Sequence, residues 1–316
     1  MIRRSMKARA ILLGPQRREP RVREAVEQLL GRKRRTNVAL VTAGWEERED
    51  EDGEFREHLG LPMENLAIWE RIERIFERDP ELLDAVRERH DRLRSLQELY
   101  RVRLEGLVAG VVALSARSDS EDLVGPERIA ALEMLRSLDR EHAERVTQVH
   151  QEFDKRWRPR KRETIVSERR EVEKLLDGAD CLCIAGGHVG VLMHRLQLFG
   201  VLELWGNRPV VAWSAGAMVL TDNIVLFHQE EGQGARTEVK EAGFGLLPGI
   251  VPLPHASKRL DLSDNASMQL LAQRFAPAMC VPLDQGQQIV WDGRGWSGPE
   301  GTQQISETGE LVEVAR

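Results

Sequence analysis

Short apolar runs alternate with amphipathic stretches in the first sixty residues of the chain. Residues 8–14 (ARAILLG) and 37–44 (NVALVTAG) are strand-like, and residues 20–32 between them carry apolar side chains at helical spacing. Strands that are apolar on both faces are typical of parallel sheets covered by helices on two sides. This segment therefore predicts a β-α-β unit of an α/β protein.

The same pattern returns after residue 177. Residues 263–275 have helical periodicity, and the strand-like runs are 180–187, 208–216, 223–227, 249–255, 279–284 and 287–293. We therefore expect one mostly parallel sheet, sandwiched by helices as in flavodoxin-like folds and built from residues 1–60 and 177–316.

Residues 61–176 have a different pattern, that of long, charge-rich amphipathic helices. Two such stretches, 81–116 and 126–157, are separated by the turn-like sequence RSDSEDLVG. We interpret 61–176 as a helical insertion, with a helical hairpin as its main part. Residues 64–70 (ENLAIWE) are too few to decide whether they form a further strand.

One part of the insertion is apolar nearly all round the helix. In residues 105–116 (EGLVAGVVALSA), the apolar side chains exceed what a single partner helix can cover. We expect this part to pack on the sheet domain or in a homodimer interface. The alternative is a self-contained hairpin with a solvated charged face.

Composition and charge narrow the classes of partner. The 316 residues are 41% hydrophobic and 31% charged with a formal net charge of −6, so no basic field is present to recruit nucleic acid. No apolar run has the length of a signal peptide core or a membrane span, and we expect a cytoplasmic protein without membrane partners. Cys181, Cys183 and Cys280 fit reduced core residues, and no metal site is predicted.

Ser214 follows an apolar strand and precedes small residues in the sequence RPVVAWSAGAM. This is the sequence form of a nucleophile elbow, in which the serine sits on a sharp strand-to-helix turn and the next backbone N–H points to a developing oxyanion. Ala215 supplies that N–H, and Gly216 is small enough for the turn to close. A serine in this position can also be a simple helix N-cap.

A nucleophilic serine needs a base, and His255 is the strongest of the eight histidines. It ends the strand at 249–255, at the sheet edge where ligands bind in open α/β folds. His58, His90, His142 and His150 lie in charged or helical surroundings and are interpreted as solvated. The orienting acid is expected between Ser214 and His255, where Asp222, Glu230 and Glu231 are available; Glu230 is preferred because it follows a strand.

A second turn has features suited to an anion. In CIAGGHVGVLMHRL a buried strand is followed by Gly186 and Gly187 and then by a helix, so backbone N–H groups can face an oxyanion. Gly187 is the expected donor, and the alternative is an ordinary tight turn. The glycines do not form a dinucleotide-binding fingerprint.

Four segments together resemble peptidase family S51, which includes dipeptidase E and cyanophycinase within the class I glutamine amidotransferase-like fold. They are AGGHVGVLMHRL, AWSAGA, GFGLLPGI and PHASKR, in the family's order. The resemblance implies Ser214 as nucleophile, His255 as base, Gly187 and Ala215 as oxyanion donors, and Glu230 or Glu231 as acid. It further implies that Arg259 binds a substrate carboxylate.

The sequence departs from the family pattern in several places. Ala185 and His188 flank the glycine pair where a third glycine and an asparagine are usual, Ala256 replaces a phenylalanine, and Asp261 stands where cyanophycinases have arginine. The last difference weakens cyanophycin as substrate. The helical insertion has no counterpart in the short dipeptidases.

These features predict a serine hydrolase that cleaves a peptide or amide bond through an acyl-enzyme and requires no cofactor. A small peptide or amide is its expected substrate. The alternative is a catalytically silent binding or assembly module of the same fold that acts through its helical insertion.

Overall fold

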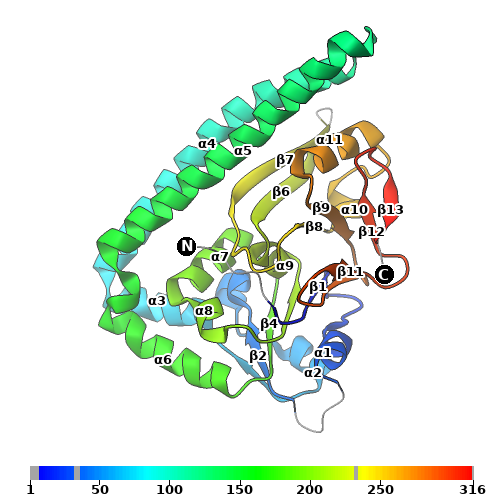
Figure 1. Ribbon diagram of the computed structural model, residues 1–316. Coiled ribbons are helices and arrows are strands. Elements are labelled where there is room, and N and C mark those ends of the chain that lie inside the picture. The colour runs from blue at the N-terminus through cyan, green and yellow to red at the C-terminus, as the bar shows by residue number, and fades with distance from the viewer. Residues whose placement is uncertain (1–6, 32–35, 231–233, 315–316) are drawn as a thin grey trace.

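A computed structural model of the chain describes residues 7–31, 36–230 and 234–314 (Figure 1). Its centre is a seven-stranded sheet in which the strands from β1 to β3 are parallel to one another, while β10 and β11 are antiparallel. In spatial order the strands are β11 (Trp296–Ser297), β10 (Gln288–Trp291), β1 (Ala10–Leu13), β5 (Val210–Trp213), β4 (Cys181–Ile184), β2 (Val38–Val41) and β3 (Met63–Asn65). The expected mostly parallel α/β sheet is confirmed, with β1 beside β5 rather than beside β2.

Helices cover both faces of this sheet because each central strand is apolar on both sides. Ile11 and Leu13 face α1 (Val22–Leu30) and α2 (Gly53–Leu59), whereas Leu12 faces the opposite side. The elements that cover that opposite face are α3 (Ile68–Arg78), α6 (Glu163–Asp177), α7 (Val189–Phe199), α8 (Val201–Trp205) and α9 (Ala215–Leu220).

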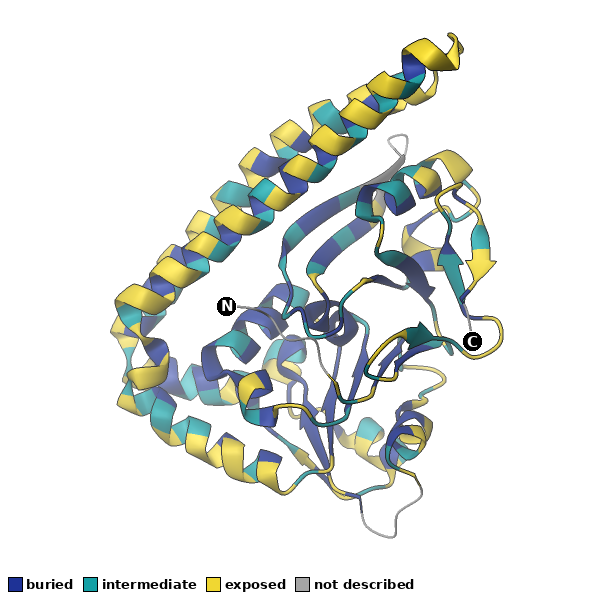
Figure 2. Ribbon diagram, in the orientation of Figure 1, coloured by how far each residue is buried: buried dark blue, intermediate teal, exposed yellow. Residues whose placement is uncertain are grey.

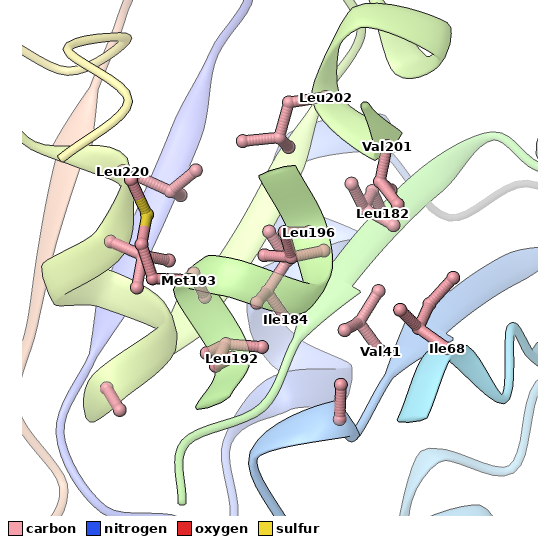
Figure 3. Packing of buried hydrophobic residues seen from close by; sticks show 14 of the residues in the cluster. Val41, Ile68, Leu182, Ile184, Leu192, Met193, Leu196, Val201, Leu202 and Leu220 are labelled. Carbon is pink, nitrogen blue, oxygen red and sulfur yellow. The ribbon is translucent and has the colours of Figure 1, made fainter. Parts of the chain in front are cut away.

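The α7 helix lies in the centre of the second covering layer. Figure 3 shows Leu192, Met193 and Leu196 of α7 packed with Ile184 of β4 and Leu220 of α9. The burial pattern in Figure 2 shows the same order, with the central strands buried and the covering helices exposed on their outer sides. This packing fixes the position of the glycine turn that precedes α7.

The helical insertion is a hairpin of two long helices, α4 (Pro80–Ser115) and α5 (Glu121–Trp157), which extends well beyond the sheet (Figure 1). Its boundaries differ from the expected 61 and 176. β3 pairs with β2, and apolar side chains of α3 and α6 lie in the core of the sheet domain. The amphipathic pattern of α3 and α6 resembles that of the hairpin, which is why the sequence did not separate them.

A second, smaller sheet lies on the side of the molecule away from the α4/α5 hairpin, and His255 directly follows one of its strands (Figure 1). It consists of β13 (Leu311–Glu313), β12 (Gln303–Ile305), β9 (Met279–Leu283) and β8 (Ile250–Pro254), with α10 (Ala256–Arg259) and α11 (Asn265–Phe275) beside it. The antiparallel pair β6 (Asn223–Glu230) and β7 (Gly234–Ala242) runs between this sheet and the hairpin (Figure 1).

A buried polar network fastens the hairpin to the rest of the protein. Arg274 of α11 donates from Nε and Nη2 to the two carboxylate oxygens of Asp139 on α5, both at 2.7 Å. Tyr100 of α4 donates to Asp139 at 2.7 Å and accepts from Arg274 at 2.8 Å. Its hydroxyl also accepts from the backbone N–H of Val239 on β7. Four elements are thus joined at one point.

Two expectations about individual residues are resolved by burial. The three cysteines are free and buried, as predicted for core residues. The interpretation of His142 and His150 as solvated is wrong: His142 is 3% exposed and the side chain of His150 is 14% exposed. Both lie on the side of α5 that faces β7, where helical amphipathicity places them inward. Among the described helices, none is long and apolar enough to cross a membrane.

Candidate active site

Ser214 stands between β5 and α9 in a strained backbone conformation. Its φ is 52° and its ψ is −122°, a region that non-glycine residues rarely occupy. Its backbone N–H donates to Leu13 O of β1 at 3.2 Å, and its carbonyl accepts from Ala217 N at 3.0 Å. These bonds hold a sharp strand-to-helix turn at Ser214, and its role as a nucleophile elbow stays a prediction.

Small residues make the elbow possible because two backbones approach it closely. A Cβ on Gly216 would lie 2.2 Å from Ile184 O at the end of β4. A Cβ on Gly186 would lie 2.7 Å from Cβ of Ser214 and 3.4 Å from Ala215 N. The glycine turn after β4 is therefore in direct contact with the serine turn after β5.

The segment after a third strand, β2, also contacts the glycine turn and holds it in place. Gly187 has a φ of 110°, and a Cβ there would lie 2.1 Å from Gly44 O in the segment after β2. His188 N donates to the same Gly44 oxygen at 2.7 Å, and His188 Nδ1 accepts from Val191 N in the first turn of α7. Gly44 was not predicted from the sequence, although it lies three residues after the end of β2 at the carboxyl edge of the sheet.

His255 follows β8 directly and has a left-handed backbone, with φ 60° and ψ 33°. Its N–H donates to Leu283 O of β9 at 3.2 Å. Gly14, at the end of β1, approaches the same turn so closely that a Cβ on it would lie 2.9 Å from Leu283 O. Because the adjacent Leu13 O accepts from Ser214 N, the end of β1 contacts both the serine turn and the histidine turn.

The side chains of Ser214 and His255 are not hydrogen-bonded to each other within the described part of the chain. Catalytic hydrogen bonds are often long or absent without substrate and tighten in the complex. The structure thus places the two residues on turns that both contact the end of β1, and their catalytic contact stays a prediction.

The surroundings of His255 lower its pKa. Partial burial is the main cause, the positive charges of Arg259 and Lys258 add to it, and Asp284 opposes it. A pKa below the usual value near 6.5 keeps the imidazole neutral at pH 7. This is the protonation state that a general base requires.

The acids proposed from the sequence are not brought to His255 within the described residues. Asp222 follows α9, at the opposite end of that helix from Ser214, and its carboxylate accepts from Gly249 N at 3.1 Å. Glu230 ends β6, and its side chain lies outside the described residues, as does the whole of Glu231. The third member of the triad therefore stays open.

Asp284 is the carboxylate whose charge acts on His255, and sequence analysis missed it. It follows β9, which is parallel to β8 with Pro254 opposite Leu283, so the next residues in register are His255 and Asp284. Both Asp284 carboxylate oxygens accept from Ser257 N, at 3.1 and 3.2 Å. Asp284 thereby anchors the first turn after His255, and the shared register is the signal that could have identified it.

Arg259 is exposed on α10, four residues after the histidine. Its guanidinium lies 5.8 Å from the centre of the Phe227 ring on β6 and forms no ion pair within the described residues. An exposed guanidinium beside an aromatic ring keeps its donors available for a carboxylate. Its role in substrate binding stays a prediction.

Comparisons with known proteins give one family match and two similar solved structures. The sequence model described as Peptidase family S51 matches residues 135–297, a segment that includes Gly187, Ser214 and His255. No curated protein sequence matches the chain significantly. Among solved structures, a peptidase from an acI-B1 Actinobacterium aligns over 98% of this chain and 96% of its own, with 14% identity and a TM-score of 0.47. A protein assigned as peptidase E from Listeria monocytogenes EGD-e aligns over 92% and 98%, with 12% identity and a TM-score of 0.45.

Proposed function

The chain belongs to peptidase family S51, whose sequence model matches more than half of its 316 residues, and from that premise we propose that it is a serine hydrolase acting on a peptide or amide bond. The observation that carries this proposal is the backbone of Ser214, held at φ 52° and ψ −122° between β5 and α9. A helix N-cap usually has an extended backbone and needs no such strain.

In the proposed reaction, His255 takes the proton of Ser214 Oγ as the oxygen attacks the substrate carbonyl. The negative charge on the carbonyl oxygen is stabilised by the backbone N–H groups of Ala215 and Gly187. His255 then donates its proton to the leaving amine, and water hydrolyses the acyl-enzyme by the same route. These steps need neither a metal nor an organic cofactor.

The imidazolium that forms in this reaction requires a negative charge near it. Asp284 supplies one from the turn after β9, and Glu230 or Glu231 is the acid that the family resemblance implies.

Arg259 is proposed to bind a substrate carboxylate, which favours short peptides with an acidic side chain or a free carboxyl end near the scissile bond.

Covalent labelling tests this proposal independently of the substrate. A fluorophosphonate probe should modify the native protein on Ser214, as located by peptide mass spectrometry, because an activated serine attacks phosphorus as it attacks a carbonyl. Ser214→Ala and His255→Ala should both abolish labelling. Ser257→Ala is the matched control, since Ser257 contributes only its backbone N–H to the Asp284 contact, and it should label normally.

Absence of labelling in the folded wild-type protein would instead support the alternative, a silent binding or assembly module that acts through the α4/α5 hairpin. Labelling that persists in His255→Ala would contradict the role of His255 as base.

A further inference from the structure

Three side chains with metal-ligating atoms converge where the base of the hairpin meets α7 and β7. They are His150 of α5, His194 of α7 and Glu241 of β7, and their ligating atoms all lie within 4.8 Å of one another. His150 Nε2 is 3.0 Å from Glu241 Oε2, and His194 Nε2 is 3.2 Å from Glu241 Oε1. This cluster is separate from the turns that carry Ser214 and His255.

These spacings agree with coordination of one cation. Zinc binds imidazole nitrogen and carboxylate oxygen at about 2.0–2.2 Å in a tetrahedral arrangement, which places neighbouring ligand atoms roughly 3.3 Å apart. Both histidines offer the same ring atom, Nε2, toward the carboxylate. Two imidazoles and one carboxylate are also the ligand set typical of zinc sites that keep a fourth position open.

Arg89 on α4 lies next to the cluster, and its positive charge opposes a bound cation. Arg89 is 7% exposed, lies near enough to Glu241 for the two charges to interact, and stacks on Phe153 with 4.2 Å to the ring centre. A buried arginine beside a buried carboxylate normally forms a bidentate ion pair with it. Here Arg89 Nε has no hydrogen-bond partner within the described residues, and the Glu241 oxygens face the histidines instead.

His90 borders the cluster on its exposed side. Its ring centre is 5.2 Å from that of His194, nearly the same as the 5.3 Å between the rings of His150 and His194. Imidazoles bound to one tetrahedral zinc have ring centres about this far apart, given the bond length of about 2.0–2.1 Å. His90 therefore lies beside His194 at the border of the cluster, while the ligand atoms that lie within 4.8 Å of one another are those of His150, His194 and Glu241.

We propose that His150, His194 and Glu241 bind a zinc-type divalent cation, with the fourth position open. Such a site joins the hairpin base to β7 and to α7, the helix whose first turn follows Gly187. The cation then stabilises the attachment of the insertion and holds α7 in place. This inference does not depend on whether Ser214 is catalytic.

Cobalt provides a direct test, because tetrahedral Co²⁺ has strong visible ligand-field absorption. The full-length protein, freed of metal with a chelator, should bind one equivalent of Co²⁺ with this absorption and lose it on addition of Zn²⁺. Zn²⁺ should also raise the melting temperature. Glu241→Gln and His150→Gln should each weaken Zn²⁺ binding by more than about 100-fold, the upper end of the loss seen for outer-shell partners.

Two further variants distinguish this site from a buried ion-pair network. Arg89→Met removes a like charge beside the cation and should tighten Zn²⁺ binding. His142→Gln is the matched control: His142 is also buried on α5, but its Nε2 contacts Gln97 and the backbone oxygen of Lys240, and its loss should leave the affinity unchanged.

Two results would overturn the proposal. One is the absence of Co²⁺ absorption in the wild-type protein, and the other is absorption that survives in both Glu241→Gln and His150→Gln. If these variants do not fold, chemical modification of the wild type decides instead. Zn²⁺ should protect His150, the more exposed of the two histidine ligands, from diethyl pyrocarbonate, and equal modification of His150 with and without Zn²⁺ would contradict the site.

Discussion

Ser214 and His255 share an uncommon property: both have positive φ although neither is glycine. Each such residue costs on the order of 1–3 kcal/mol and persists only where its surroundings fix it. Here Leu13 O holds the serine turn and Leu283 O holds the histidine turn. The apolar strand followed by small residues predicted the sharp turn at Ser214. The contact of Asp284 with the histidine turn depends on the pairing of β8 with β9, which the sequence pattern does not reveal.

The pH dependence of hydrolysis should report the charges around His255. Because the base must be neutral, kcat/KM should rise with pH through the pKa of His255, with a midpoint below the value near 6.5 of free imidazole. Asp284→Asn removes the opposing negative charge and should move the midpoint to lower pH. Lys258→Met removes a positive charge and should move it to higher pH. A midpoint that is unchanged in both variants would contradict the assignment of His255.

Crowding at Gly186 gives a steric test of the elbow. Gly186→Ala places a methyl group 2.7 Å from Cβ of Ser214 and should displace the nucleophile or the oxyanion turn, lowering kcat by on the order of 10²-fold. Gly178→Ala is the control, since its nearest neighbour is 3.6 Å away, and it should retain full activity. Equal activity of the two variants, with unchanged circular dichroism, would show that the turns do not form one site.

At the scale of elements, the sequence predicted the strands better than the division of the helices. Runs that are apolar on both faces identified β1, β2, β4 and β5, because central strands of a covered sheet have no polar face. β3 has only three residues and gave no usable pattern. The inward histidines of α5 and Glu241 of β7 come together only in three dimensions, so the proposed cation site was not visible in the sequence.

The attachment of the hairpin should depend strongly on Asp139. Removing its carboxylate leaves Arg274 buried without its bidentate partner, so Asp139→Ala should lower the free energy of unfolding in urea by about 3–5 kcal/mol. Glu141→Ala on the same helix breaks exposed pairs with Arg103 and Arg145 and should change stability little. Similar stabilities of the two variants would show that the network does not fasten the hairpin.

At the scale of the whole molecule, the hairpin offers more apolar surface than the protein itself covers. Leu107 and Val108 pack in a cluster with residues of α5 and α11, as expected for packing on the rest of the protein, but Val112 is 54% exposed. Val102 and Ile129 are more than 70% exposed. A homodimer through the insertion therefore stays a prediction.

Light scattering coupled to gel filtration measures this association. The wild-type protein should have the mass of a dimer, and Val102→Lys combined with Ile129→Lys should have that of a monomer, because charges on an apolar interface are costly to bury. Lysine at an exposed polar position of the same hairpin, Glu105→Lys, should leave the dimer intact. A monomeric wild-type protein would remove the support for this interface.

The central claim is that Ser214 performs hydrolysis, and the most direct measurement compares wild-type protein with Ser214→Ala on a panel of Asp-X, β-aspartyl and longer peptides. We expect at least one peptide to be cleaved by the wild type. Loss of the nucleophile should then lower kcat by roughly 10⁴-fold or more, as expected when a triad member is removed. Turnover by Ser214→Ala at the wild-type rate would contradict the account.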